Sequence, residues 1–112
     1  MEWIPLTDTA QLQEIISKSK ERPQVVFKHS TRCSISSVAM QRLKRGMVPG
    51  EFDFYYLDII SYRSLSNQVA DVFDVSHESP QILVIRNGAC VYDESHMSIT
   101  PTDIIENLGT AA

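Results

Sequence analysis

The sequence predicts an α/β domain with a single mixed β-sheet and helices on both faces. Two observations predict it. Short strand-forming runs alternate with segments of helical periodicity along most of the chain, which favours parallel pairing of the strands. Later in the chain, Asn87-Gly88 separates two strand-like runs and indicates a tight hairpin, because both turn positions need positive φ. The chain, residues 1–112, is long enough for one such domain and too short for two.

The first half of the chain contains two expected strands and two expected helices. Residues 3–6 fit a short edge strand, because their proline is tolerated only at an edge or a strand end. Asp8 followed by Gln11 forms a loose capping box for the first helix. Residues 24–28 are expected to form a short strand, and its three consecutive apolar residues, Val25, Val26 and Phe27, predict a central strand covered on both faces. The next helix, residues 34–45, is expected to bury one face formed by Ile35, Val38, Ala39 and Leu43.

The second half contains three further strands and two further helices. An aromatic-rich strand is expected at residues 52–57. The two strands of the hairpin are expected at residues 81–85 and 89–92. Thr100 precedes a proline and is expected to cap a last helix that ends at Gly109. The third helix is expected to bury one face formed by Leu65, Val69, Val72 and Phe73. This order of elements is that of the thioredoxin-like architecture.

Composition and charge exclude several classes of function. Hydrophobic residues make up 43% of the chain and charged residues 21%, an ordinary balance for a globular protein. The net charge of −4, with no basic block, does not support nucleic-acid binding. No apolar run approaches the roughly 18 residues of a membrane span. The N-terminus lacks the pattern of a signal peptide, so we expect a cytoplasmic protein.

Cysteine and histidine usage argues against a metal site. Cys33 and Cys90 are too few for a closed zinc site without histidine, and His29, His77 and His96 show no ligand spacing. Two distant cysteines in a cytosolic protein are also unsuited to a structural disulfide. We therefore expect no bound metal and no bound cofactor.

Cys33 is the strongest candidate for a reactive group. It follows an apolar strand and lies where a helix should begin, and a helix N-terminus favours thiolate over thiol. Lys28, His29 and Arg32 add positive or potentially positive charge, which lowers the pKa of a thiol. The alternative, a small buried hydrophobe, fits poorly with the polar residues on both sides. Hydroxyl donors surround the cysteine: Ser30, Thr31, Ser34 and Ser36.

The residue three positions after Cys33 predicts a one-cysteine site. Ser36 stands where many redox proteins carry a second cysteine, and a serine cannot close an intramolecular disulfide. Its hydroxyl could bond the Cys33 thiolate, or it could only satisfy backbone N–H groups of the first helical turn. Ile35 could present apolar surface at the site or belong to the core.

Four further positions have less specific patterns. Cys90 lies in a short apolar strand, which favours a packed free thiol over a resolving cysteine. His77 could border the site or lie on a solvated loop. His96 could make a structural hydrogen bond or be equally solvated. Ser79-Pro80 directly precedes a strand, where a proline commonly punctuates a loop.

A family resemblance is carried by five blocks that follow one another along the chain: FKHSTRCSIS at 27–36, LDII at 57–60, RSLSN at 63–67, VSHESPQ at 75–81 and SH at 95–96. In this combination the chain resembles the YtxJ-type bacilliredoxins, which are monothiol thioredoxin-like proteins. The resemblance covers nearly the whole chain.

The resemblance implies thiol–disulfide exchange. Cys33 would be the nucleophile, Ser36 its partner in the helix, and Pro80 a cis proline opposite the thiol. The activity implied is removal of bacillithiol, or another low-molecular-weight thiol acting as co-substrate, from mixed disulfides on cytosolic proteins. The residues implied to contact the substrate are Thr31, Arg32, Ser34, Ile35, Ser79 and Pro80.

Two other functions remain open at this point. A redox-inert interaction module could keep the same fold, and an unperturbed Cys33 thiol would favour it. Some monothiol glutaredoxins hold an iron–sulfur cluster between two chains. Their motif has glycine after the cysteine, where this chain has Ser34.

Overall fold

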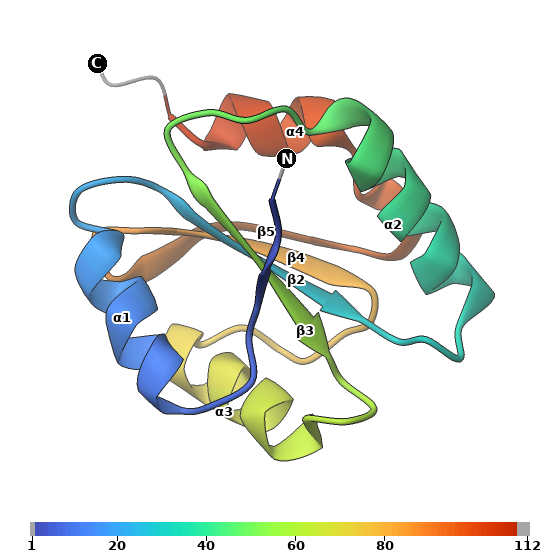
Figure 1. Ribbon diagram of the computed structural model, residues 1–112, viewed down its shortest axis with the longest axis horizontal. Helices are drawn as coiled ribbons and strands as arrows, with labels where there is room; N and C mark the ends of the chain where they lie inside the picture. Colours follow the sequence, from blue (N-terminus) through green and yellow to red (C-terminus); the bar gives the residue numbers. More distant parts are fainter. Residues whose placement is uncertain (1, 110–112) are drawn as a thin grey trace.

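The computed structural model describes residues 2–109. Its helices and strands follow the predicted order along the chain (Figure 1). A short 3₁₀ helix, η1, is the one addition. The elements are β1 (Ile4–Pro5), α1 (Ala10–Lys18), β2 (Gln24–His29), α2 (Ser34–Gly46), β3 (Asp53–Asp58), α3 (Arg63–Phe73), β4 (Gln81–Arg86), β5 (Ala89–Ser95), η1 (His96–Ser98) and α4 (Pro101–Asn107).

The five strands form one mixed sheet in the order β1-β3-β2-β4-β5. β3 is parallel to both β1 and β2, whereas β4 is antiparallel to β2 and to β5. The expectation of parallel pairing is therefore wrong for β4. The loop after α3 returns the chain to the end of the sheet where β2 finishes, so that Gln81 pairs with Lys28 (Figure 1).

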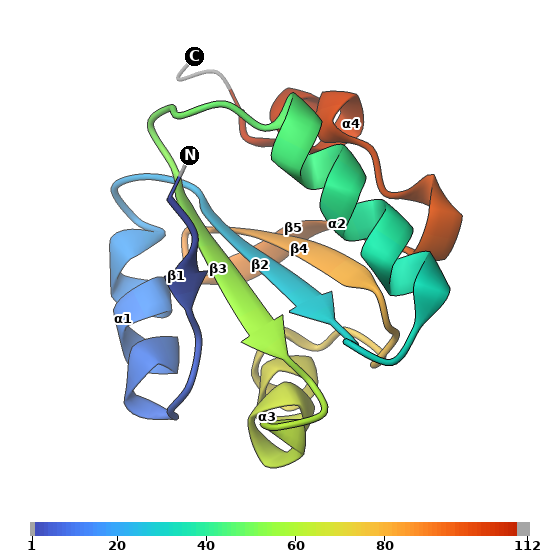
Figure 2. The same ribbon diagram turned by 45° about the vertical axis from the view of Figure 1, so that its right-hand side comes forward.

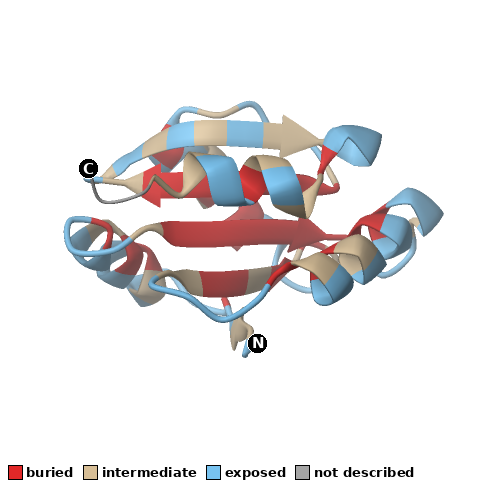
Figure 3. Cartoon of the chain, turned by 90° about the horizontal axis from the view of Figure 1, so that it is seen from above, coloured by how far each residue is buried: buried red, intermediate tan, exposed pale blue. Residues whose placement is uncertain are grey.

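Helices cover both faces of this sheet, as predicted. α1 and α3 lie on one face, and α2 and α4 lie on the other (Figure 2). All six residues of β2 are buried, which matches a central strand covered from both sides (Figure 3). Alternate side chains of β2 therefore enter two separate cores, one beneath each pair of helices.

Local signals explain where the elements begin and turn. Gln11 N–H donates to Asp8 Oδ1 (3.2 Å) and Asp8 N–H donates to Gln11 Oε1 (3.1 Å), which is the reciprocal pattern of a capping box. Asn87 and Gly88 have φ of 53° and 79°, as a two-residue hairpin turn requires. Asp103 N–H donates to Thr100 Oγ1 (3.3 Å) at the start of α4.

The buried faces of two helices differ from the prediction. Ile35 and Val38 are 42% and 43% exposed on α2, and Val72 is 46% exposed on α3. The core-facing positions of α2 are instead Ser36, Ala39 and Leu43. The periodicity of apolar residues failed at the start of α2 because a buried serine, and not an isoleucine, turns toward the sheet.

Candidate functional site

Cys33 lies just outside the C-terminal end of β2, as the residue that caps α2. Its backbone is extended, with φ −112° and ψ 123°, and its side chain is half-buried. The Cys33 carbonyl accepts from Ser37 N–H (3.1 Å) and Ser37 Oγ (3.3 Å), while Cys33 N–H donates to Ser30 O (3.2 Å). These bonds hold the Cys33 backbone in place, so that its side chain lies at a helix N-terminus, where the helix dipole favours an anion.

Ser36 is fully buried and has two partners, neither of which is Cys33. Its Oγ accepts from Ser30 N–H (3.0 Å) and lies 2.6 Å from His29 Nδ1. Burial lowers the pKa of His29, which favours the neutral ring, and Ser36 Oγ and His29 Nδ1 share one hydrogen bond. The sequence left open whether this hydroxyl bonds the Cys33 thiolate or only backbone N–H groups. In the structure it contacts Ser30 N–H and His29 Nδ1, and a bond to Cys33 stays a prediction.

Of the three cations expected near Cys33, only one has an exposed side chain beside it. Lys28 is completely buried, and its Nζ donates to Ser66 O (3.1 Å) and lies 3.2 Å from His77 Nδ1. Lys28 and His29 alternate across the sheet, and each is tied to a helix. Arg32 alone is exposed beside the cysteine. The expectation that all three cations surround the thiol is therefore wrong.

The Ser79–Pro80 peptide bond is cis, as the resemblance implied. Pro80 immediately precedes Gln81, the residue that pairs with Lys28, so this loop lies at the end of β2 that leads to Cys33. His96 N–H donates to Pro80 O (3.0 Å), so the structural hydrogen bond that the sequence left open for His96 is made by its backbone. His96 adopts φ 58°, a conformation in which His is enriched, but the sequence did not indicate Pro80 as its partner.

The side chains of His77 and His96 make further contacts around the loop that leads to Pro80. His77 is exposed, yet its Nδ1 reaches Ser66 Oγ (3.3 Å) as well as the buried Lys28 amine. Burial lowers the pKa of His77, and the neighbouring Lys28 charge lowers it further. His96 Nε2 lies 3.5 Å from Glu78 Oε2, and both side chains are half-exposed.

The residues predicted to contact substrate fall into two groups around Cys33. Four of them surround the start of α2 with exposed side chains: Thr31, Arg32, Ser34 and Ile35. The other two belong to the loop before β4, where Ser79 is half-buried and Pro80 is buried. Ser79 Oγ is itself buried and has no hydrogen-bond partner within residues 2–109.

Cys90 lies at the opposite end of the sheet. It pairs with Ile85, which in turn pairs with Gln24 at the start of β2. The rest of β2 spans about 16 Å at ~3.3 Å per residue, and Cys33 lies beyond it. A disulfide needs Cα atoms within about 7 Å, so the two cysteines of one chain cannot bond directly in this fold. Burial raises the pKa of Cys90, whose Sγ donates to Tyr92 O (3.2 Å).

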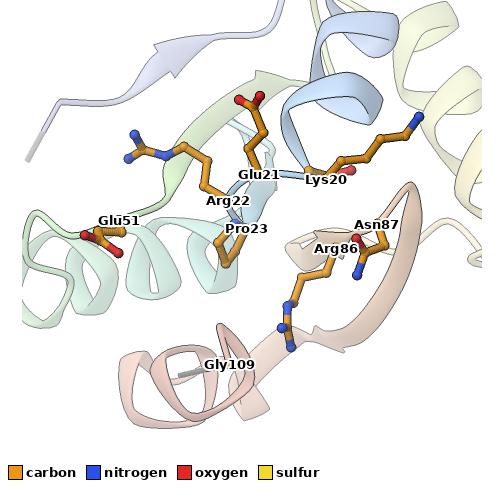
Figure 4. A pocket seen from close by; sticks show the side chains of 9 residues that line it. Lys20, Glu21, Arg22, Pro23, Glu51, Arg86, Asn87 and Gly109 are labelled. Atoms are coloured by element: carbon orange, nitrogen blue, oxygen red, sulfur yellow. The ribbon is translucent and has the colours of Figure 1, made fainter. Parts of the chain in front are cut away.

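A polar pocket occupies the end of the sheet remote from Cys33 (Figure 4). It lies between Pro23, which precedes β2, and Asn87 of the hairpin. Its charged residues are of both signs: Lys20, Glu21, Arg22, Glu51 and Arg86. It is lined by no cysteine and does not extend the thiol site.

Two features that residues 2–109 lack bear on the kind of site. No cluster of three or more His, Cys, Asp or Glu side chains has an arrangement that could hold a metal ion. Within the same residues, no helix has the length and apolar character needed to cross a membrane.

Comparison with known proteins decides the family. The profile of the family described as monothiol bacilliredoxin BrxC matches residues 4–104. The chain belongs to this family. A solved structure described as a candidate oxidoreductase with a thioredoxin fold is 30% identical, with a TM-score of 0.81 over 92% of this chain and 90% of that one.

Thioredoxins share the fold with this bacilliredoxin family member at lower identity. A mutant thioredoxin from Halobacterium salinarum is 10% identical, with a TM-score of 0.75 over 99% of this chain and 94% of that one. Thioredoxin from Malassezia sympodialis is 13% identical, with a TM-score of 0.73 over 96% and 88%. The thioredoxin-like α/β fold is thus shared across proteins of very different sequence.

Proposed function

We propose that this protein removes a low-molecular-weight thiol, bacillithiol or a close analogue, from mixed disulfides on cytosolic proteins. One observation carries the proposal: Cys33 stands at the start of α2 with a buried serine, Ser36, in the place of a second cysteine. A single thiol at a helix N-terminus can exchange with a disulfide but cannot release its partner by closing on itself.

The chemistry is a balanced exchange of disulfide bonds. The Cys33 thiolate attacks the sulfur of the small thiol in the mixed disulfide. The bond between that sulfur and the client sulfur breaks, and the client thiolate takes a proton from water. Cys33 is left in a mixed disulfide with the small thiol. A second small thiol then attacks this disulfide, which restores Cys33 and releases the symmetrical small disulfide, or a reductase does the same.

The residues around Cys33 have distinct roles in this scheme. The exposed side chains of Thr31, Arg32, Ser34 and Ile35 contact the substrate that approaches the thiol. Ser79 and Pro80 line the opposite side, where backbone groups before the cis proline pair with the client chain. The unpartnered Ser79 hydroxyl supports this assignment, because a buried polar group without a partner is unusual in a free protein.

The test is mass spectrometry of the purified protein after exposure to oxidised bacillithiol and to oxidised glutathione, with release from a bacillithiolated client protein measured in parallel. We expect one adduct, at Cys33, and no release by Cys33→Ser. Cys90→Ser should keep both reactions nearly unchanged, because its buried thiol is protonated and lies at the far end of the sheet.

Other outcomes point elsewhere. No adduct with either small thiol would favour a redox-inert module, and a visible absorption band after anaerobic reconstitution would favour a cluster-binding protein. If Cys90→Ser were as inactive as Cys33→Ser, a two-cysteine cycle between chains would replace the monothiol mechanism.

A further inference from the structure

The charges of this chain are segregated around the active-site helix. Residues 25–50 contain five of the ten Lys and Arg residues and none of the fourteen Asp and Glu residues. The remainder of the chain therefore has a large excess of acids, although the whole protein has a net charge of −4. Lys28 is completely buried, but the other four cations of this segment are exposed or half-exposed, so an acidic protein presents a locally basic surface along α2 and just before it: Arg32, Arg42, Lys44 and Arg45.

The arginines of α2 lie on one stripe with exposed apolar residues. Ile35, Val38, Arg42 and Arg45 are spaced by three, four and three positions, which places them along one helical face. Ile35 and Val38 are 42% and 43% exposed, and the two arginines follow them toward the end of the helix. This stripe, residues 35, 38, 42 and 45, leads away from Cys33, which caps the start of α2, toward the C-terminal end of the helix.

Nothing within residues 2–109 neutralises this stripe. The two ion pairs in that part of the chain are Arg22–Asp53 and His96–Glu78. Arg42 Nη1 donates to Met97 O (3.0 Å), which leaves the rest of the guanidinium for a partner. The two arginines and Val38 line a shallow pocket of about 360 Å³ together with Ser37 and Gln41.

We propose that the stripe docks the client protein and favours clients that carry acidic residues near the thiolated cysteine. The inference rests on the proposed function, since it concerns the substrate of the same thiol. Ile35 and Val38, with Met97 at 50% exposure beside α2, cover the apolar part of the client next to the disulfide. Arg42 and Arg45 bind carboxylates further along, in the paired geometry that arginine favours.

The positions of Arg42 and Arg45 along α2 predict how far the acidic residues of a client should lie from its thiolated cysteine. Arg42 and Arg45 lie about 14 and 18 Å from Cys33 along the axis, at 1.5 Å per residue. An extended segment covers these distances with about four and five residues, at ~3.3 Å each. The preferred acids are therefore four and five positions from the client cysteine.

The experiment compares three peptides that carry bacillithiol on a single cysteine and Glu, Gln or Lys at the fourth and fifth positions. With the wild-type protein we expect the Glu peptide to be dethiolated about fivefold faster than the Lys peptide at low salt. The ratio should fall toward one at high salt. Duplex DNA is included as a competitor, because a general polyanion site would bind it equally well.

Variants locate the effect. Arg45→Glu should remove or reverse the preference for the Glu peptide over the Lys peptide, and an unchanged urea denaturation midpoint shows that the variant is folded. Arg45→Gln should give an intermediate ratio. Lys20→Glu makes the same charge change at an exposed residue remote from α2, and it should keep the wild-type preference.

Equal rates for the Glu and Lys peptides with the wild-type protein would overturn the docking proposal, as would competition by DNA as strong as that by the Glu peptide. A preference that survives Arg45→Glu would overturn it too. Failure to dethiolate any of the three peptides would instead contradict the proposed function.

Discussion

Replacement of Lys28 by methionine should change how stability depends on pH. The Lys28 side chain is completely buried, and its amine contacts Ser66 O and His77 Nδ1 but no carboxylate within residues 2–109. Burial lowers the pKa of Lys28 from 10.5 to about 8. Below pH 8 the amine is charged in both the folded and the unfolded chain, and the penalty of burying that charge is present in full.

Above pH 8 the folded protein holds the amine neutral while the unfolded chain still binds the proton. The free energy of unfolding therefore rises with pH until the unfolded amine also titrates, near pH 10.4. The shift corresponds to roughly 3 kcal/mol in total, of which about 2 kcal/mol is recovered between pH 7 and 9.5. His77, which contacts the amine, does not obscure this window, because burial and the Lys28 charge lower its pKa from the ordinary value of 6.5 and so away from the window.

Urea denaturation of the wild type and of Lys28→Met at several values between pH 7 and 9.5 measures this effect. Methionine keeps most of the side-chain volume, so lost contacts contribute a constant offset. We expect the stability of the wild type relative to the variant to rise by about 2 kcal/mol across the window. Lys20→Met, at an exposed position, should show no such change. A difference between wild type and Lys28→Met that stays flat would refute the reasoning.

Two further substitutions test the site and the packing. Ser36→Ala leaves His29 Nδ1 and a buried backbone N–H without a partner, so it should destabilise the fold by about 1–3 kcal/mol in urea denaturation. It should slow dethiolation without abolishing it, and a folded variant with no activity would contradict this expectation. Gly46→Ala places a Cβ against the Pro101 ring and should lower stability by about 1–3 kcal/mol with an unchanged dethiolation rate. Val48→Ala, at a 61% exposed position in the next loop, is its control and should have little effect.

The sequence predicted the elements well because their signals are local. The capping box at Asp8, the turn at Asn87-Gly88 and the apolar strand at residues 24–28 each depend on a few neighbouring residues. The predicted direction of β4 was wrong. A strand's direction depends on where the preceding loop re-enters the sheet, and the periodicity of apolar residues carries no information about that. The resemblance, and not the Ser79–Pro80 dipeptide, predicted the cis bond.

The site was predicted less completely because its polar residues are buried. A pattern of apolar residues assigns Ile35 to the core and Ser36 to the surface, whereas the structure does the opposite. The serine is stable inside because His29 and a backbone N–H satisfy its hydroxyl. Such pairing joins residues seven positions apart through the fold, and hydropathy along the chain cannot detect it.

The last two residues of β2 connect the two segments that build the site. Lys28 faces one side of the sheet, where it bonds α3 and His77 of the loop that leads to Pro80. His29 faces the other side, where it bonds Ser36 in the first turn of the helix that Cys33 caps. Because β2 is the central strand and all its residues are buried, both segments are anchored to the interior of the fold. The thiol and the proline loop are thereby held relative to one another before a substrate arrives, which reduces the ordering that exchange would otherwise require.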